Sequence, residues 1–202
     1  MPSRKLLLLA CLAALAVPAT SFAEEPQPVY LAPEFTSLGI ERAMLMPHID
    51  ARMDTSSRVN FTRLIHQMSK PAFQRKGYKL DYLELKEGQP QPKMDLEAYR
   101  TGDSTWIRTL PAGDDRWALV VCLEDANSTG GHGANETVEI SAALFDVVRG
   151  VPVWRGRAAG HQEINGTSKM LSMGMATHGN QMMMALSSAM HDVMDTLPKK
   201  PK

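Results

Sequence analysis

Methionine and histidine side chains gather in a short segment near the end of the chain. Met170, Met173, Met175 and His178 follow the spacing Met-x-x-Met-x-Met-x-x-His. Thioether sulfur and imidazole nitrogen are soft ligands of the kind that Cu(I) selects, and an oxidising compartment favours thioethers over thiolates. One interpretation is therefore a Cu(I) or Ag(I) site built from these four side chains.

Packing is the competing interpretation of the same methionines. Methionine fills irregular gaps in apolar cores, and the chain contains 14 methionines in all. From Met182 onward, apolar residues recur at helical spacing through Met190 and Met194, which is typical of a buried helix face. We expect core packing for most of these side chains. A third interpretation is that residues 168–184 form an adaptable surface for a protein partner.

Cysteine and glycine motifs give no sign of catalysis. Cys122 lies in the apolar run Leu119–Leu123, where we expect a small buried hydrophobic residue rather than a nucleophile. The chain has no Gly-x-Ser-x-Gly elbow, Walker loop, His-Glu-x-x-His or Cys-x-x-Cys motif. The run Gly130–Gly133 lacks the Lys-Ser/Thr pair that a phosphate-binding loop needs. The sequence thus predicts no catalytic residues, no bound cofactor apart from the Cu(I) alternative, and no enzyme.

Two tryptophans stand close to arginines in the sequence. The segments are Trp106-Ile107-Arg108 and Trp154-Arg155. Aromatic side chains pack well against sheets, and arginine ordinarily keeps its charged end in water. We interpret both segments as packing aromatics with solvated arginines rather than as a ligand cage.

Charge and composition narrow the class of protein further. The chain has 202 residues, with 22 basic and 22 acidic side chains and therefore no formal net charge. A strongly basic surface is the electrostatic signature of nucleic-acid binding, so we expect no nucleic-acid partner. Hydrophobic residues make up 44% of the chain and charged residues 22%, which excludes a wholly disordered protein. This length fits one domain.

Residues 1–23 have the three parts of a secretory signal peptide. Arg4 and Lys5 give a positive start, Leu6–Val17 is an unbroken apolar run, and small residues precede a cleavage site after Ala23. The apolar run has about 12 residues, fewer than the roughly 20 that a membrane-spanning helix needs. We therefore expect export to the periplasm of a bacterium, and no integral membrane segment once the signal is removed.

Cys11 raises the alternative of an outer-membrane lipoprotein. The segment Leu8-Leu9-Ala10-Cys11 resembles a lipobox, in which the cysteine becomes the lipidated first residue. Only five apolar residues precede Cys11, however, and the apolar stretch Leu12–Val17 follows it, whereas a lipoprotein tether is normally polar. The signal-peptide interpretation is therefore preferred, and lipidation at Cys11 stays an alternative.

Apolar periodicity and turn residues divide the exported chain into a leader over residues 24–39, one domain over 40–197 and a basic tail over 198–202. The predicted elements of the domain are a strand over 42–53 interrupted by Pro47, a helix from 59 that Pro71 kinks or ends before Gly77, a strand over 78–83, one or two helices within 95–110, strands over 116–124, 137–148 and 151–159, and a closing helix from 182 to 197.

This order predicts an α/β (α+β) fold. Its sequence is β-α-β-α-β-β-β-α, which favours a single mixed β-sheet with helices packed on it and right-handed crossovers. The run Trp117–Leu123 is apolar on both faces, which is typical of a central strand in a covered sheet.

Three segments resemble one family of bacterial envelope proteins. Met44–Asp50 is similar to an opening strand that ends in Pro-Pro-x-x-Asp, with His48 departing from the pattern. Leu64–Tyr78 resembles a first helix that ends in glycine and an aromatic residue. Ala142–Gly156 resembles a hairpin of the form L-x-D-x-x-x-G-x-x-x-W-x-G, in which Asp146 would bond local backbone amides, Gly150 would take the turn and Trp154 would cover the sheet.

The family is that of the TolB N-terminal-like (anticodon-binding-like) α/β fold, as in curli-secretion and penicillin-binding-protein-activator lipoproteins. The resemblance implies non-enzymatic work, as an adaptor or assembly factor with envelope protein partners. It leaves the oligomeric state open. The chain has no lipobox at Ala23, so the resemblance does not extend to the family's usual outer-membrane anchor. The alternative from the residues themselves is a periplasmic Cu(I)- or Ag(I)-binding protein.

Overall fold

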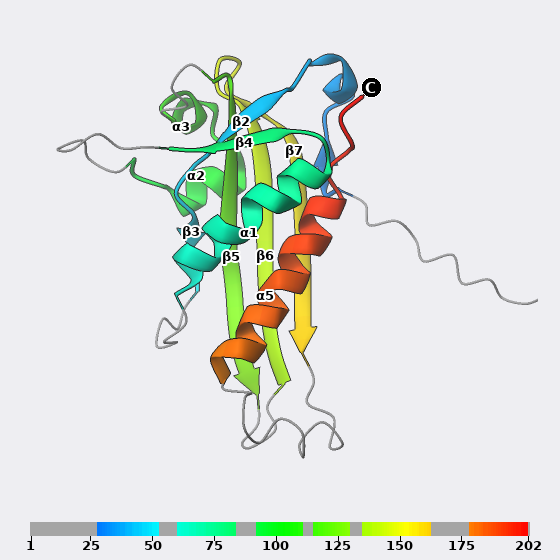
Figure 1. Ribbon diagram of the computed structural model, residues 1–202. Coiled ribbons are helices and arrows are strands. Elements are labelled where there is room, and N and C mark those ends of the chain that lie inside the picture. Colours follow the sequence, from blue (N-terminus) through cyan, green and yellow to red (C-terminus); the bar gives the residue numbers. More distant parts are fainter. Residues whose placement is uncertain are drawn as a thin grey trace, which may run out of the picture.

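The computed structural model describes residues 28–52, 60–83, 92–110, 115–129, 135–162 and 178–201. The signal segment 1–23 therefore lies outside the described residues. Within them, seven strands form a single mixed sheet in the order β1-β7-β6-β5-β2-β4, with β3 also pairing with β5 (Figure 1). The predicted α+β fold with one mixed sheet is confirmed.

The elements follow the chain in this order: β1 (Tyr30–Leu31), a 3₁₀ turn (Phe35–Ser37), β2 (Arg42–Leu45), β3 (Ile49–Asp50), α1 (Phe61–Arg75), β4 (Lys79–Tyr82), α2 (Leu96–Thr101), α3 (Ser104–Arg108), β5 (Trp117–Thr129), β6 (Asn135–Asp146), β7 (Val151–Gln162) and α5 (His178–Asp195).

Strand β5 is the centre of the sheet, as its apolar sequence predicts. It pairs antiparallel with β6 along its length and parallel with β2 and β3 on its other side. Leu119 and Val121 point into one buried cluster, whereas Ala118, Val120 and Cys122 point into another on the opposite face. Because both faces are covered, the strand can be apolar at every position.

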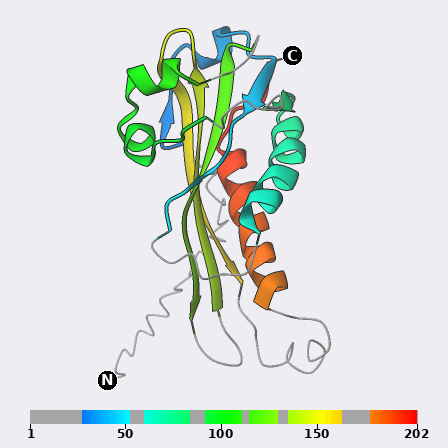
Figure 2. The same cartoon turned by 90° about the vertical axis from the view of Figure 1, so that its left-hand side faces the viewer.

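Two pairs of helices cover the two faces of the sheet. Helices α1 and α5 pack on one face, and the shorter α2 and α3 pack on the other, which Figure 2 shows with the sheet nearly edge-on. Helices α2 and α3 cover only one end of their face, so the far halves of β5, β6 and β7 carry no described helix on that side. None of the described helices is long and apolar enough to span a membrane.

Helix α1 begins and ends close to where the sequence predicts, but Pro71 does not end it. The Asn60 side chain accepts a hydrogen bond from the Arg63 backbone N–H (3.0 Å), which caps the first turn. The helix continues through Pro71 to Arg75, because the apolar face that includes Ala72 and Phe73 is buried in the core. Packing of that face compensates for the one backbone hydrogen bond that proline cannot make.

The β6–β7 hairpin has the residue roles that the resemblance implies. Asp146 accepts a hydrogen bond from the Arg149 backbone N–H (3.0 Å), and Gly150 turns the chain at φ 73°. Trp154 is fully buried in the core beneath α5. Strands β5 and β7 run further than predicted, and β6 begins and ends two residues earlier. The polar residues at the far ends of β5 and β6 pair with each other, as at Asn127 with Thr137, although they give no apolar signal in the sequence.

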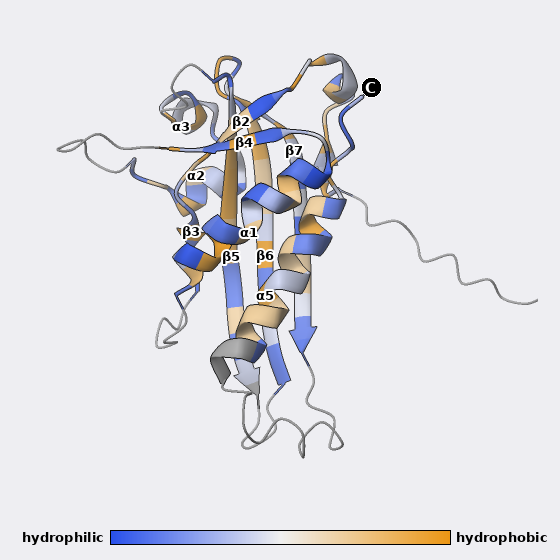
Figure 3. Cartoon of the chain, in the orientation of Figure 1, coloured by the Kyte–Doolittle hydropathy of each residue, from blue (hydrophilic) through white to orange (hydrophobic). Residues whose placement is uncertain are grey.

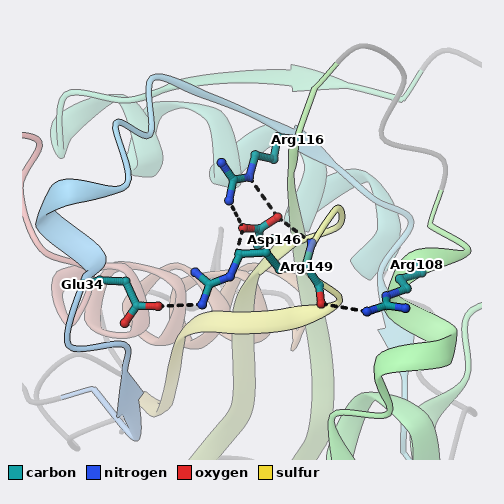
Figure 4. A network of polar contacts seen from close by, with 5 residues as sticks. All are labelled: Glu34, Arg108, Arg116, Asp146 and Arg149. Carbon is teal, nitrogen blue, oxygen red and sulfur yellow. Dashed lines mark hydrogen bonds and ion pairs between the residues drawn. The ribbon is translucent and has the colours of Figure 1, made fainter.

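Asp146 also joins several elements through charge, as Figure 4 shows. Both carboxylate oxygens accept hydrogen bonds from Arg116, with 3.0 Å between Arg116 Nε and Oδ1. Arg149 extends the network by an ion pair with Glu34 (2.9 Å), and Arg108 donates to the Arg149 backbone oxygen (3.4 Å). Asp146 has no solvent exposure. The start of β5, the hairpin turn, α3 and the leader are therefore connected around one buried carboxylate.

Helix α5 and strand β7 approach closely at two glycines. An ideal Cβ at Gly160 would overlap the carbonyl oxygen of Ala185 and stand 2.7 Å from the backbone nitrogen of Ala189. At Gly156 it would stand 2.5 Å from Thr196 Oγ1 and 3.0 Å from Val193 Cγ2. Glycine is therefore required at both positions because helix backbone or side chains occupy the space of a side chain.

The predicted leader and tail both contribute contacts in their described parts. Tyr30 and Leu31 form β1 on the edge of β7, and Phe35 enters the core. In the tail, the Tyr78 hydroxyl donates to the Pro198 carbonyl (3.0 Å), and the Lys200 N–H donates to the Lys76 carbonyl (2.7 Å). These contacts attach both segments to the domain predicted for residues 40–197.

Candidate functional site

A hollow on the less covered face of the sheet brings together polar side chains from four elements. We call it the arginine hollow. It has a volume of about 480 Å³ and lies where β1 ends beside β7. Its lining residues are Val29, Tyr99, Arg100, Glu124, Ser141, Ala142, Arg155, Gly156 and Arg157. Three arginines and one glutamate line it, which makes its wall cationic.

A chain of hydrogen bonds runs across the floor of the arginine hollow. The Ser141 hydroxyl donates to Glu124 Oε1 (2.6 Å), and the Arg100 guanidinium donates to Glu124 Oε2 (2.8 Å). The Tyr99 hydroxyl lies 3.0 Å from Ser141 Oγ. Because the proton of Ser141 points to Glu124, Tyr99 is the donor in this last contact.

These contacts and burial determine the protonation states of Glu124 and Tyr99. Burial alone would raise the pKa of the Glu124 carboxyl, but the hydrogen bonds from Ser141 and Arg100, and the charge of Arg100, lower it below its ordinary value. Burial raises the pKa of the Tyr99 hydroxyl well above its usual range. Glu124 is therefore an ionised acceptor and Tyr99 a neutral donor near neutral pH.

Arg155 and Arg157 form the side of the hollow on β7. The Arg155 guanidinium donates to the backbone oxygens of Tyr99 (3.0 Å) and Arg100 (3.2 Å), which fixes the end of α2 over the sheet. Its Nε is buried and has no hydrogen-bond partner among the described residues. Arg157 pairs with Glu139 (2.6 Å) across the neighbouring strand and is 58% exposed. Arg155 is therefore half-buried, because α2 packs over it.

Cys122 has the packing role that the sequence predicts. It is fully buried on the central strand, and this burial raises the pKa of its thiol to about 12. We therefore expect the folded protein to resist a water-soluble disulfide reagent at about pH 8 at this position, because the thiolate is the reactive form. Unfolding in guanidinium should make the Cys122 thiol react fast. Rapid labelling of Cys122 in the native protein would contradict the buried, neutral thiol.

The predicted metal site falls almost wholly outside the described residues. Met170, Met173 and Met175 lie in the segment 163–177, and of His178 only the backbone, at the start of α5, is described. Copper binding at these residues stays a prediction. In the described ranges, no group of three or more histidine, cysteine or acidic side chains could hold a metal ion. Further along α5, Met182, Met190 and Met194 are buried in the core, which confirms packing for these methionines.

Sequence reasoning missed the arginine hollow. Arg100, Glu124, Ser141 and Arg155 come from α2, β5, β6 and β7, so no spacing along the chain relates them. A weak signal does exist, because Glu124 directly follows the apolar run Trp117–Leu123 and Ser141 stands between the apolar residues Ile140 and Ala142. The pairing of β5 with β6 brings Glu124 and Ser141 together, and the packing of α2 adds Arg100 to them.

The fold and the hollow define this molecule as a single-sheet α+β protein with a cationic surface site. No family model and no curated protein matches the chain. Among solved structures, it is similar to the PelC dodecamer from Paraburkholderia phytofirmans, with 11% identity, a TM-score of 0.48, and coverage of 79% of this chain and 89% of that chain.

Two other solved structures are similar to it. Lipoprotein GNA1162 from Neisseria meningitidis has 17% identity and a TM-score of 0.41, with 66% of this chain and 91% of that chain covered. Protein XCC0632 from Xanthomonas campestris has 13% identity and a TM-score of 0.45, with 85% and 90% covered. The TolB-like resemblance stays a prediction.

Proposed function

We propose that this chain is an exported, non-enzymatic accessory protein of the bacterial cell envelope, an adaptor or assembly factor that binds an envelope protein of a secretion or cell-envelope system at the arginine hollow. The signal features of residues 1–23 support export. The observation that carries the binding role is the convergence of Arg100, Arg155 and Arg157 on one open hollow. Arginine suits recognition of carboxylates because its donors form a planar fork.

The chemistry of the floor supports binding more than catalysis. Glu124 is held ionised by two donors, so it is a poor proton donor near neutral pH. Ser141 donates its proton to that carboxylate, and none of its hydrogen-bond partners among the described residues is a histidine. Cys122, beneath the floor, is neutral. These groups are arranged to position the arginines.

Export is tested first by fusing residues 1–40 to alkaline phosphatase, which is active only in the periplasm. We expect activity from this fusion and none when Leu9 and Leu12 are replaced by arginine, because charge in the apolar run abolishes a signal peptide. A fusion that is inactive in both forms would remove the compartment on which the proposal depends.

Binding is tested in cells with a photocrosslinking residue placed at Arg157 and, as a matched control, at Lys70 on the opposite face of the sheet. We expect one discrete crosslinked envelope protein from position 157 that is absent from position 70. Its yield should fall when Arg100 is replaced by glutamate, since the proposal assigns recognition to the cationic wall. Equal crosslinking from both positions, or turnover of an ester or phosphate substrate by the pure protein, would contradict the proposal.

A further inference from the structure

Strand β7 is an edge of the sheet over its second half. On its outer side it pairs with β1 only at Trp154 and Arg155, and the Ala32 N–H donates to the Val153 carbonyl (2.9 Å) just before them. From Arg157 to Gln162, the described residues pair with β7 only from β6. This half of β7 ends in hydrophilic residues (Figure 3).

The sequence of the leader stops β1 from extending along this edge. Backbone groups alternate along a strand, and Ala32 faces β7, so Tyr30 faces it as well, and residue 28 would face it if the strand continued. Residue 28 is Pro28, which has no N–H to donate. A continuation in the same register would bring Pro26 to the next such position. Pro28, which lacks an N–H at the next position that must donate, therefore ends the pairing at Tyr30.

The same alternation identifies the open backbone groups of β7. Val153 and Arg155 face β1, so the N–H and C=O groups of Arg157, Ala159 and His161 point away from β6. Within the described chain, no strand pairs with these three residues on their outer side. Unpaired groups along a sheet edge are a template for one more strand.

The charge beside this edge indicates the kind of strand that fits. The side chains of Arg155, Arg157 and His161 lie on the same face as the arginine hollow, and Val29 and Gly156 line the hollow where β1 ends. Strand β7 contains no acidic residue. A second copy of β7 would therefore bring two further arginines and no carboxylate to this edge. An acidic segment from another protein is therefore favoured over self-association.

We infer that the outer edge of β7, from Arg157 to His161, accepts an extended segment of a partner protein as an additional strand, with an acidic side chain of that segment in the arginine hollow. This inference rests on the proposed function and names the chemistry of its partner. Main-chain hydrogen bonds supply affinity, and the hollow supplies the preference for an acidic residue.

The test uses the purified protein and a synthetic probe. The probe is a capped seven-residue peptide of alternating threonine and valine with a central glutamate, and its control carries glutamine at that position. Amide hydrogen exchange is followed by NMR. We expect the probe to slow exchange at Arg157, Ala159 and His161 by at least about tenfold at saturation, and to leave the alternate amides, which already bond to β6, unchanged. The glutamine peptide should bind several-fold more weakly.

A pair of matched variants separates edge pairing from other modes of binding. Ala159→Pro removes one outward N–H, and proline is tolerated on a strand edge where that N–H faces solvent. We expect this variant to unfold at nearly the same temperature as the parent and to lose probe binding. Ala159→Val keeps the N–H and should bind like the parent. Arg157→Gln should reduce the preference for glutamate over glutamine and retain the alternate pattern of exchange.

Several results would overturn the inference. They are binding that survives Ala159→Pro, binding without slowed exchange at the edge, no binding at millimolar probe, and edge amides that are already protected in the free protein. Protection that rises with protein concentration would assign the edge to a second copy instead. If the edge fails these tests but crosslinking from position 157 persists in cells, the proposed function stands without this partner. If export fails, the exchange results are unaffected.

Discussion

Replacing Gly160 with alanine is expected to lower the free energy of unfolding by about 3 kcal/mol, the upper end of the range for overpacked cores. The added Cβ would overlap the carbonyl oxygen of Ala185 and press on the backbone nitrogen of Ala189. Backbone atoms cannot turn aside as a side chain can, so α5 must move away from β7. Chemical denaturation with parent and variant at the same pH measures the loss.

Gly156→Ala is the matched comparison, because its added Cβ would meet mostly side chains. The atoms it would approach are Thr196 Oγ1, Trp154 Cζ2 and Val193 Cγ2. We expect Val193→Ala or Thr196→Ala, combined with Gly156→Ala, to recover part of the lost stability. No truncation of a single side chain on α5 should rescue Gly160→Ala. A Gly160→Ala variant as stable as the parent would contradict the close approach of α5 to β7.

Replacing Asp146 with alanine is expected to cost about 3 kcal/mol, the low end of the range for breaking a buried ion pair. The carboxylate has no solvent exposure and accepts hydrogen bonds from Arg116 and from the Arg149 N–H. The cost is at the low end because the Arg116 side chain is 43% exposed and can be hydrated when its partner is lost. Asp146→Asn keeps an acceptor for the Arg149 N–H and should cost about 1.5 kcal/mol.

Glu34→Gln is the control for this network. It removes the ion pair to Arg149, whose two side chains are both well exposed, at 44% and 40%. Exposed pairs contribute little, so we expect a much smaller loss of stability than for Asp146→Ala. Equal losses for Glu34→Gln and Asp146→Ala would contradict a special role for the buried carboxylate.

The Asp146 network also predicts how stability depends on pH. Burial opposes ionisation of Asp146, but the hydrogen bonds from Arg116 and Arg149 outweigh it and lower the pKa of this carboxyl. A carboxyl with a lowered pKa stabilises the fold above its unfolded pKa of about 3.9, and that stabilisation is lost as the pH falls through the folded value. The difference in melting temperature between the parent and Asp146→Asn should therefore be constant near neutral pH and shrink below about pH 4. A difference in melting temperature that grows on acidification would contradict the lowered pKa of Asp146.

The sequence by itself determined the order of the elements from β2 to α5, the central strand and the tight hairpin. These depend on neighbours along the chain: an apolar run from Trp117 to Leu123, helical spacing from Met182, and Asp146 with Gly150 at a turn. Burial pattern and turn chemistry are local properties, which is why they can be inferred before any tertiary contact is known.

Only the tertiary structure decided where the polar residues meet. The arginine hollow depends on the pairing of β5 with β6 and on the packing of α2 over Arg155, and the open edge of β7 depends on where β1 stops. Glu124 and Ser141 are 17 positions apart in the chain, yet their side chains are 2.6 Å apart in the fold. Pairing partners are chosen by long-range packing, and residue spacing along a single sequence does not contain that information.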